Sequence, residues 1–218
     1  RTYMEKKHQV HNLIILDESG SMQSIREMII SGFNELVQTI KGIEKEYPEQ
    51  EHFISLVTFN GLGRKVIHFT EPAAMLESID SSKYQPNYST PLYDAMGDSI
   101  TSLKQALGKQ KNCSVLVTIL TDGEENASKE YNGIAIKKLV EEMKQLGWTF
   151  TYIGTDHDVE KFATNISITN VMFYKKDTGG VNELFRKERD ARAAYSQKIR
   201  AKKNTNDDFY ETDESGKS

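Results

Sequence analysis

The chain has 218 residues, a formal net charge of −4 and 28% charged residues. This length suits one domain with a sizeable core, and the mild acidity argues against a general nucleic-acid binder. The single cysteine, Cys113, excludes an internal disulfide. No apolar stretch approaches the length of a membrane span, and the first residues lack the apolar core of a signal peptide. We therefore expect a cytoplasmic protein that contacts neither membrane nor nucleic acid.

Apolar patterning predicts strands and helices that alternate along most of the chain. Short runs rich in β-branched and aromatic residues predict strands at residues 10–16, 53–59, 65–69, 114–120, 148–153 and 170–174. Apolar residues at helical spacing predict helices at residues 22–47, 92–107, 134–146, 157–163 and 181–202. A short helix or turn is expected at residues 71–79.

The order of these elements predicts an α/β fold. It is a doubly wound, Rossmann-like, mostly parallel six-stranded sheet with helices on both faces. Residues 53–59 and 65–69 are too close in sequence for a crossover helix, so they form a hairpin that places one antiparallel strand at an edge. We expect one domain over residues 9–202 and a polar, disordered tail over residues 203–218.

Oxygen-bearing side chains follow two of the predicted parallel strands. Asp17, Ser19 and Ser21 come directly after the first strand, and Asp122 follows the fourth. Thr90 is expected to cap the helix that begins near Pro91, with its N-terminus toward the same edge. Doubly wound sheets bind ligands beyond the carboxyl ends of their strands, and hydroxyl and carboxylate oxygens suit Mg²⁺ or Mn²⁺. The sequence therefore predicts a metal site formed by Asp17, Ser19, Ser21, Thr90 and Asp122.

Three segments carry a resemblance to a known family. Residues 17–22 read Asp-Glu-Ser-Gly-Ser-Met, Thr90 lies in Ser-Thr-Pro-Leu-Tyr-Asp-Ala, and residues 121–123 read Thr-Asp-Gly. In motif order and spacing they resemble the metal-ion-dependent adhesion site of the von Willebrand factor A domain family, which is also called the integrin I-domain fold. The resemblance covers about residues 9–195. The form of the motif is similar to intracellular bacterial members, including the tellurite-resistance and chelatase-associated groups.

The resemblance implies a role for each matched residue. Ser19 and Ser21 would coordinate the metal directly, Thr90 would do so in the ligand-ready state, and Asp17 and Asp122 would act mainly through water. One coordination position would stay open for an Asp or Glu of a partner protein. The family implies Mg²⁺, with Mn²⁺ or Ca²⁺ also possible. A residue that can join or leave the coordination sphere would provide a two-state switch.

The leading interpretation is a non-enzymatic module that binds a protein partner through the metal. One alternative is a phosphatase or phosphotransferase of the haloacid-dehalogenase type, with Asp17 as nucleophile. That class needs an acid two residues later, where this chain has Ser19. Another alternative is a structural subunit whose site no longer binds metal.

Charged residues outside the five predicted ligands have a simpler interpretation. Glu18, Glu124 and Glu125 flank the site and are interpreted mainly as solvated loop acids. The last helix is rich in arginine and lysine, but Glu188 and Asp190 interrupt its positive charge. This pattern is typical of a solvated helix face rather than of a nucleic-acid patch.

Other residues near the site leave two interpretations open. Tyr84, Tyr88 and Tyr93 would suit the rim of a protein-binding surface, but partial burial explains them equally well. Asp94 is either a helix-start charge or a supporting residue of the site. Residues 156–158, Asp-His-Asp, follow the fifth strand and favour a helix cap over a second metal site.

Overall fold

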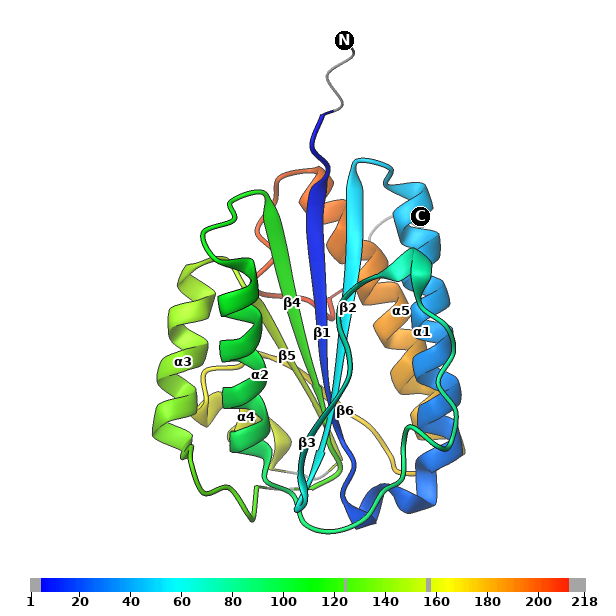
Figure 1. Cartoon of the computed structure of the whole chain (residues 1–218), viewed down its shortest axis with the longest axis vertical. Helices are drawn as coiled ribbons and strands as arrows, with labels where there is room; N and C mark the ends of the chain where they lie inside the picture. The colour runs from blue at the N-terminus through cyan, green and yellow to red at the C-terminus, as the bar shows by residue number, and fades with distance from the viewer. Residues whose placement is uncertain (1–4, 124, 156–157, 212–218) are drawn as a thin grey trace.

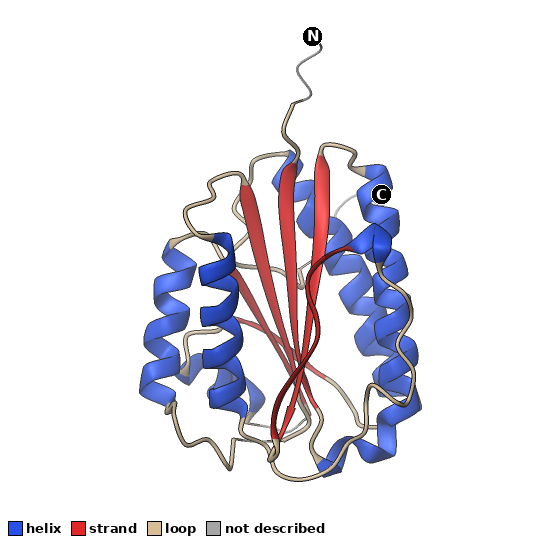
Figure 2. Ribbon diagram, viewed as in Figure 1, coloured by secondary structure: helices blue, strands red, loops and turns tan. Residues whose placement is uncertain are grey.

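A central six-stranded sheet lies between two layers of helices (Figures 1 and 2). The computed structural model describes residues 5–123, 125–155 and 158–211. The strands are β1 (His8–Asp17), β2 (Gln50–Asn60), β3 (Gly63–Pro72), β4 (Cys113–Leu120), β5 (Thr149–Gly154) and β6 (Asn170–Phe173). The helices are η1 (Gly20–Ile25), α1 (Arg26–Glu46), η2 (Ala73–Met75), α2 (Leu92–Leu107), α3 (Gly133–Gln145), α4 (Val159–Asn165) and α5 (Thr178–Arg200). In the described part of the chain, no helix combines the length and apolar character needed to cross a membrane.

The strand order across the sheet is β3-β2-β1-β4-β5-β6. All neighbouring pairs are parallel except β2 and β3, which form the expected antiparallel hairpin with β3 at the edge. The predicted fold class is therefore confirmed. The chain leaves β1 toward β2 on one side and reaches β4 on the other, so the strand order switches at β1. In the β1–β4 register Leu16 lies opposite Leu120, which brings the residues after both strands to the same place.

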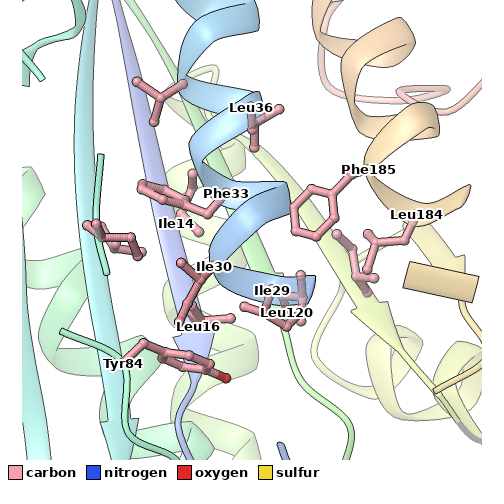
Figure 3. Packing of buried hydrophobic residues seen from close by; sticks show 14 of the residues in the cluster. Ile14, Leu16, Ile29, Ile30, Phe33, Leu36, Tyr84, Leu120, Leu184 and Phe185 are labelled. Carbon is pink, nitrogen blue, oxygen red and sulfur yellow. The ribbon is translucent and has the colours of Figure 1, made fainter. Parts of the chain in front are cut away.

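Two apolar layers follow from the alternation of side chains along β1. Leu13 and Ile15 face α2, α3 and α4 in one cluster of buried residues. Ile14 and Leu16 face α1 and α5 in the other cluster, whose packing is shown in Figure 3. The two clusters bury both faces of the strand, so the end of β1 is held rigidly at the middle of the sheet.

A glycine allows α1 and α5 to pack closely. A Cβ atom on Gly32 of α1 would lie only 2.2 Å from the ring of Phe185 on α5. Figure 3 shows the Phe185 ring directed from α5 toward α1. Because the ring is buried within this cluster, it cannot swing away into solvent to make room.

We expect Gly32→Ala to lower the free energy of unfolding by about 1–3 kcal/mol, because overpacking outweighs the better helix propensity of alanine. Gly42→Ala is the matched control on the same helix, since a Cβ there meets nothing within 4 Å. The control should be neutral or raise the free energy by up to about 1 kcal/mol. Urea denaturation of both variants measures the difference, and equal effects would contradict the packing explanation.

A buried ion pair connects α5 to the sheet. Arg192 Nε donates to Glu188 Oε2 at 3.0 Å, and the two side chains are 2% and 1% exposed. The same guanidinium donates to Asn12 Oδ1 at 3.0 Å and to Thr118 Oγ1 at 2.5 Å. The Tyr210 hydroxyl donates to the second oxygen of Glu188. The interpretation of Glu188 as part of a solvated face was therefore wrong, because this helix turns one charged pair into the core.

The segment after α5, residues 203–211, packs against the domain. Phe209 is 2% exposed and belongs to a cluster that contains Val10 of β1 and Leu116 of β4. The expected disorder is thus wrong for these nine positions of the tail, because an aromatic side chain near its end finds an apolar surface. Residues 212–218 lie outside the described residues.

Two apolar residues expected on the buried face of α3 are exposed. Ile134 is 81% exposed and Leu146 is 67% exposed, because they lie in the first turn and at the C-cap of the helix. The core contacts of α3 come from Ile136, Val140 and Met143 in its middle.

The ion pair also fixes the charge state of His52. Arg192 can only donate, so it holds the oxygen of the Asn12 amide and turns the Asn12 nitrogen toward His52 Nδ1, 3.4 Å away. His52 Nδ1 must then be an unprotonated acceptor, while Nε2 donates to Gln50 Oε1 at 3.1 Å. Burial and the positive charge of Arg192 lower the pKa of His52 to about 4.

A lowered pKa makes stability depend on pH in a known direction. Below about pH 6.5 the unfolded chain protonates His52 while the folded chain does not until about pH 4, so stability falls as the pH falls through this window. We expect His52→Gln to reduce the acid-induced loss of folding stability by on the order of 2 kcal/mol. Part of the slope should remain, because burial also lowers the pKa of His11 to about 4. Denaturation at several pH values measures the slope, and an unchanged slope in the variant would refute the assignment.

Candidate metal-binding site

Asp17, the last residue of β1, lies at the centre of the site. Its side chain is fully buried, and both carboxylate oxygens accept hydrogen bonds. Oδ1 accepts from the backbone N–H of Ser19 at 2.7 Å, and Oδ2 accepts from Thr121 Oγ1 at 2.6 Å. The buried hydroxyl of Tyr84 donates to the carbonyl oxygen of Asp17 at 2.6 Å. Asp17 thus ties the loop after β1 to the loop after β4.

A chain of hydrogen-bonding oxygens runs from this loop to the solvent. Ser19 Oγ lies 3.3 Å from Ser21 Oγ, and Ser21 Oγ donates to Asp122 Oδ1 at 2.7 Å. Ser19 is buried, whereas Ser21 is exposed. The structure therefore brings four of the five predicted ligands together at the carboxyl edge of β1 and β4, where the strand order switches.

The segment with Thr90 reaches the site through its backbone. The N–H of Gly20 donates to the carbonyl of Tyr88 at 3.0 Å. The backbone of Thr90 makes two hydrogen bonds to Asn126. The N–H of Thr90 donates to Asn126 Oδ1 at 2.9 Å, and the carbonyl of Thr90 accepts from the N–H of Asn126 at 3.1 Å. The predicted cap is wrong, because Pro91 is the N-cap of α2 without a side-chain cap bond. The helix begins at Leu92, one residue after Pro91, so Thr90 lies just before the cap position.

Asp94 of α2 holds the loop that follows β4. Its carboxylate accepts the backbone N–H groups of Lys129, Glu130 and Tyr131 at 2.8–3.0 Å. Asp94 is therefore neither a plain helix-start charge nor a group in contact with the oxygen chain. It fixes the loop between Asp122 and α3 against the helix that follows Thr90.

Lys176 is a charged neighbour of the candidate site that the sequence analysis missed. Its ammonium lies 2.6 Å from Asp122 Oδ2, and the Asp122 side chain is only 1% exposed. The lysine follows β6, so it also comes from the carboxyl end of a parallel strand. Its position after a predicted parallel strand could have pointed to Lys176. We considered only oxygen-bearing side chains at such positions in the sequence, so the lysine was not predicted. One positive charge thus already lies beside a predicted metal ligand.

Glu18 is buried rather than solvated, which corrects its interpretation. It is 4% exposed, and its Oε1 accepts from Thr58 Oγ1 at 2.7 Å. Its Oε2 accepts from Lys65 Nζ at 3.0 Å and from the backbone N–H of Gln85 at 2.6 Å. The side chain points away from the oxygen chain and joins β2, β3 and the loop at residue 85.

Two remaining acidic features lie partly outside the described residues. Glu125 accepts the N–H groups of Ala127 and Ser128 at 3.0 and 2.9 Å, so it shapes the loop after β4. Glu124 lies outside the described residues, as do residues 156–157 of the Asp-His-Asp segment.

The charge state of Asp17 follows from its burial. Burial raises the pKa of Asp17 above its usual value, and the negative charge of Asp122 adds to this rise. The hydrogen bonds from Ser19 and Thr121 act in the opposite direction. A cation beside this carboxylate would favour the ionised form, so proton release and cation binding are coupled.

The chemistry of the donor set fits a hard divalent cation. Hydroxyls of Ser19 and Ser21 lie next to the carboxylate of Asp122, and oxygen donors of this kind suit Mg²⁺. Within the described ranges, no group of three His, Cys, Asp or Glu side chains could hold a metal. Any ion here would therefore depend on the serine hydroxyls as much as on the carboxylates.

A family model for the von Willebrand factor type A domain matches residues 13–187. The chain belongs to the von Willebrand factor type A (VWA) domain family. Domains of this family typically serve in protein interactions, and the matched range includes all five predicted ligands. No curated protein sequence matches the chain.

Solved structures share the VWA fold at low sequence identity. The pilus adhesin SpaC from Lactobacillus rhamnosus GG, in its open conformation, matches with a TM-score of 0.58 and 14% identity over 85% of this chain. Proximal thread matrix protein 1 from the mussel byssus matches with a TM-score of 0.53 and 12% identity over 83%. The chain spans only 30% and 45% of these two proteins. The vWF domain of the type V pili tip protein Mfa5 from Porphyromonas gingivalis matches with a TM-score of 0.51 and 12% identity. The match covers 83% of this chain and 95% of that domain's chain.

The ion pair at Asp122 leads to a prediction about this VWA domain. We expect Lys176→Met to tighten Mg²⁺ binding by about three- to tenfold, because the ammonium no longer competes for the carboxylate. Lys175→Met removes the same charge from the neighbouring exposed position and should change the affinity by less than about twofold. Isothermal titration calorimetry measures both. If the two variants behave alike, only the net charge matters and the ion pair has no specific role.

Proposed function

We propose that this VWA domain is a Mg²⁺-dependent protein-binding module. Ser19 and Ser21 coordinate the ion through their hydroxyls, Thr90 joins them when a ligand is bound, and Asp17 and Asp122 act mainly through water. Because no protein carboxylate then neutralises the ion directly, it keeps most of its charge. It therefore attracts an Asp or Glu side chain of a partner protein. Mn²⁺ or Ca²⁺ could replace Mg²⁺ in the same oxygen set.

One observation carries this proposal. Hydroxyl and carboxylate oxygens from the loops after β1 and β4 form a single hydrogen-bonded chain that ends at an exposed serine. The sheet holds the buried residues of this hydrogen-bonded series in place, so the exposed serine at its end is preorganised for an ion. A partner can reach it from solvent. Membership of the VWA family supports the same conclusion, since its domains typically bind other proteins.

The geometry disfavours a phosphatase mechanism. Both oxygens of Asp17 accept hydrogen bonds, and the side chain is fully buried, so neither oxygen is free to attack a phosphate. Ser19 occupies the position where that class needs a general acid. Among the hydrogen bonds of the described residues, neither serine hydroxyl donates to a histidine, which is the usual activating base of a serine nucleophile. We therefore propose a binding function without catalysis. The bacterial type and the cytoplasmic location stay predictions from the sequence.

Calorimetry with Mg²⁺ tests the site. We expect the native chain to bind one ion and Ser21→Ala to weaken its binding by at least about tenfold, because a direct ligand is lost. Asp17→Ala should act in the same direction. Affinity should also fall as the pH is lowered from neutral, because the raised pKa of Asp17 lets protons compete with the ion.

Ser82→Ala is the matched control, since Ser82 is an exposed serine that bonds to Asp80 in a separate turn. It should bind Mg²⁺ like the native chain. Equal affinities for native, Ser21→Ala and Asp17→Ala proteins would rule out the site. Hydrolysis of para-nitrophenyl phosphate that disappears in Asp17→Asn would revive the phosphatase alternative.

A further inference from the structure

A groove of about 590 Å³ lies beside the candidate metal site. It runs between the turn of the β2–β3 hairpin and the loop at residues 85–88. The side chains that matter for its chemistry are those of Glu18, Arg26, Leu62, Arg64, Lys65 and Tyr88.

The groove shares a wall with the loop that carries the predicted ligands. The N–H of Asn87 donates to the carbonyl of Glu18 at 2.9 Å, and the N–H of Gly20 donates to the carbonyl of Tyr88 at 3.0 Å. The hairpin turn is equally close, because a Cβ on Gly61 would lie 2.4 Å from Ser89 Oγ. A protein segment bound at Ser21 could therefore continue into the groove without crossing open solvent.

The charge of the groove is opposite to that of the whole chain. Three cationic side chains line it against one carboxylate, although the chain carries a net charge of −4. Glu18 is already paired with Lys65, and the Arg26 guanidinium is held by the carbonyls of Tyr84 and Ser81. Arg64 is exposed, and among the described residues its side chain makes no ion pair. Its guanidinium is thus available to a carboxylate from outside.

The rim of the groove is apolar at two points. Leu62 is 75% exposed and Tyr88 is 55% exposed. Tyr88 has a φ of +69°, in the left-handed region, and its carbonyl is held by Gly20, so its backbone is fixed while its side chain faces solvent. Tyrosine and arginine are both enriched at protein interfaces, and the exposed leucine adds apolar area beside them.

We propose that this groove binds a second part of the same acidic partner, and this inference rests on the proposed function. One carboxylate of the partner would go to the ion at Ser19 and Ser21. A second acidic side chain further along the segment pairs with Arg64, while an apolar side chain between them covers Leu62 and Tyr88. The partner is thus a protein segment with at least two acidic residues and an apolar residue. A lone acid is not enough for full affinity.

A peptide selection tests this specificity. Phage-displayed short random peptides are panned on the native chain in Mg²⁺ and eluted with acid, and the selected peptides are synthesised for fluorescence anisotropy with Mg²⁺ and with chelator. We expect them to contain two separated acidic positions. Arg64→Glu should weaken binding by about tenfold, and replacing the second acid of the peptide by lysine should restore affinity for that variant. Lys137→Glu, an equal charge change on the exposed side of α3, should alter binding by less than about twofold.

The outcomes separate this inference from the function on which it rests. Chelator-sensitive peptides that lose affinity with Ser21→Ala but bind Arg64→Glu and Lys137→Glu equally would overturn the groove and keep the metal-dependent function. Selection that yields only peptides insensitive to chelator would overturn the proposed function, and with it the two-point contact.

Discussion

A carboxylate that is fully buried at the end of a central strand constrains the rest of this molecule. Asp17 cannot be left without partners in the core, because an unpaired buried charge costs several kcal/mol. Partners of the carboxylate come from the loop after β1 and from the start of the loop after β4, and Tyr84 binds the backbone carbonyl of the same residue. Their arrangement around Asp17 fixes the positions of the serine hydroxyls and of Asp122.

The sheet order explains why these partners meet. β1 and β4 are neighbours only because the chain reverses direction across the sheet after β2 and β3. Because their parallel register pairs Leu16 with Leu120, the next residues, Asp17 and Thr121, lie side by side. The covering helices bury both faces of β1, so the position of the site is determined by the core rather than by the loops. An exposed serine at its edge is the part that remains open to a partner.

Much of the fold, and the proximity of four of the five candidate ligands, could be predicted from the sequence. Strand ends and oxygen side chains are both visible in the order of residues, and the rule about carboxyl ends connects them. Contacts made by long side chains are not visible in this way. Lys176 and Glu188 could each extend into solvent or turn inward, and only the packed structure decides. The same holds for Glu18, whose partners lie about 40 to 67 positions away. The capping role given to Thr90 failed for a local reason, because α2 begins at Leu92 and Pro91 takes the cap position.

The segment that ends with Phe209 and Tyr210 has a consequence for the order of events during synthesis. Val10 leaves the ribosome about two hundred residues before the aromatic ring that packs against it. Glu188 and Arg192 likewise wait for the hydroxyl of Tyr210. The nascent chain can form the sheet and its helices before that moment, but the seam between α5 and β1 closes only after Phe209 and Tyr210 have emerged. Until then, a patch of apolar surface and a half-satisfied ion pair are open to chaperones and to other nascent chains.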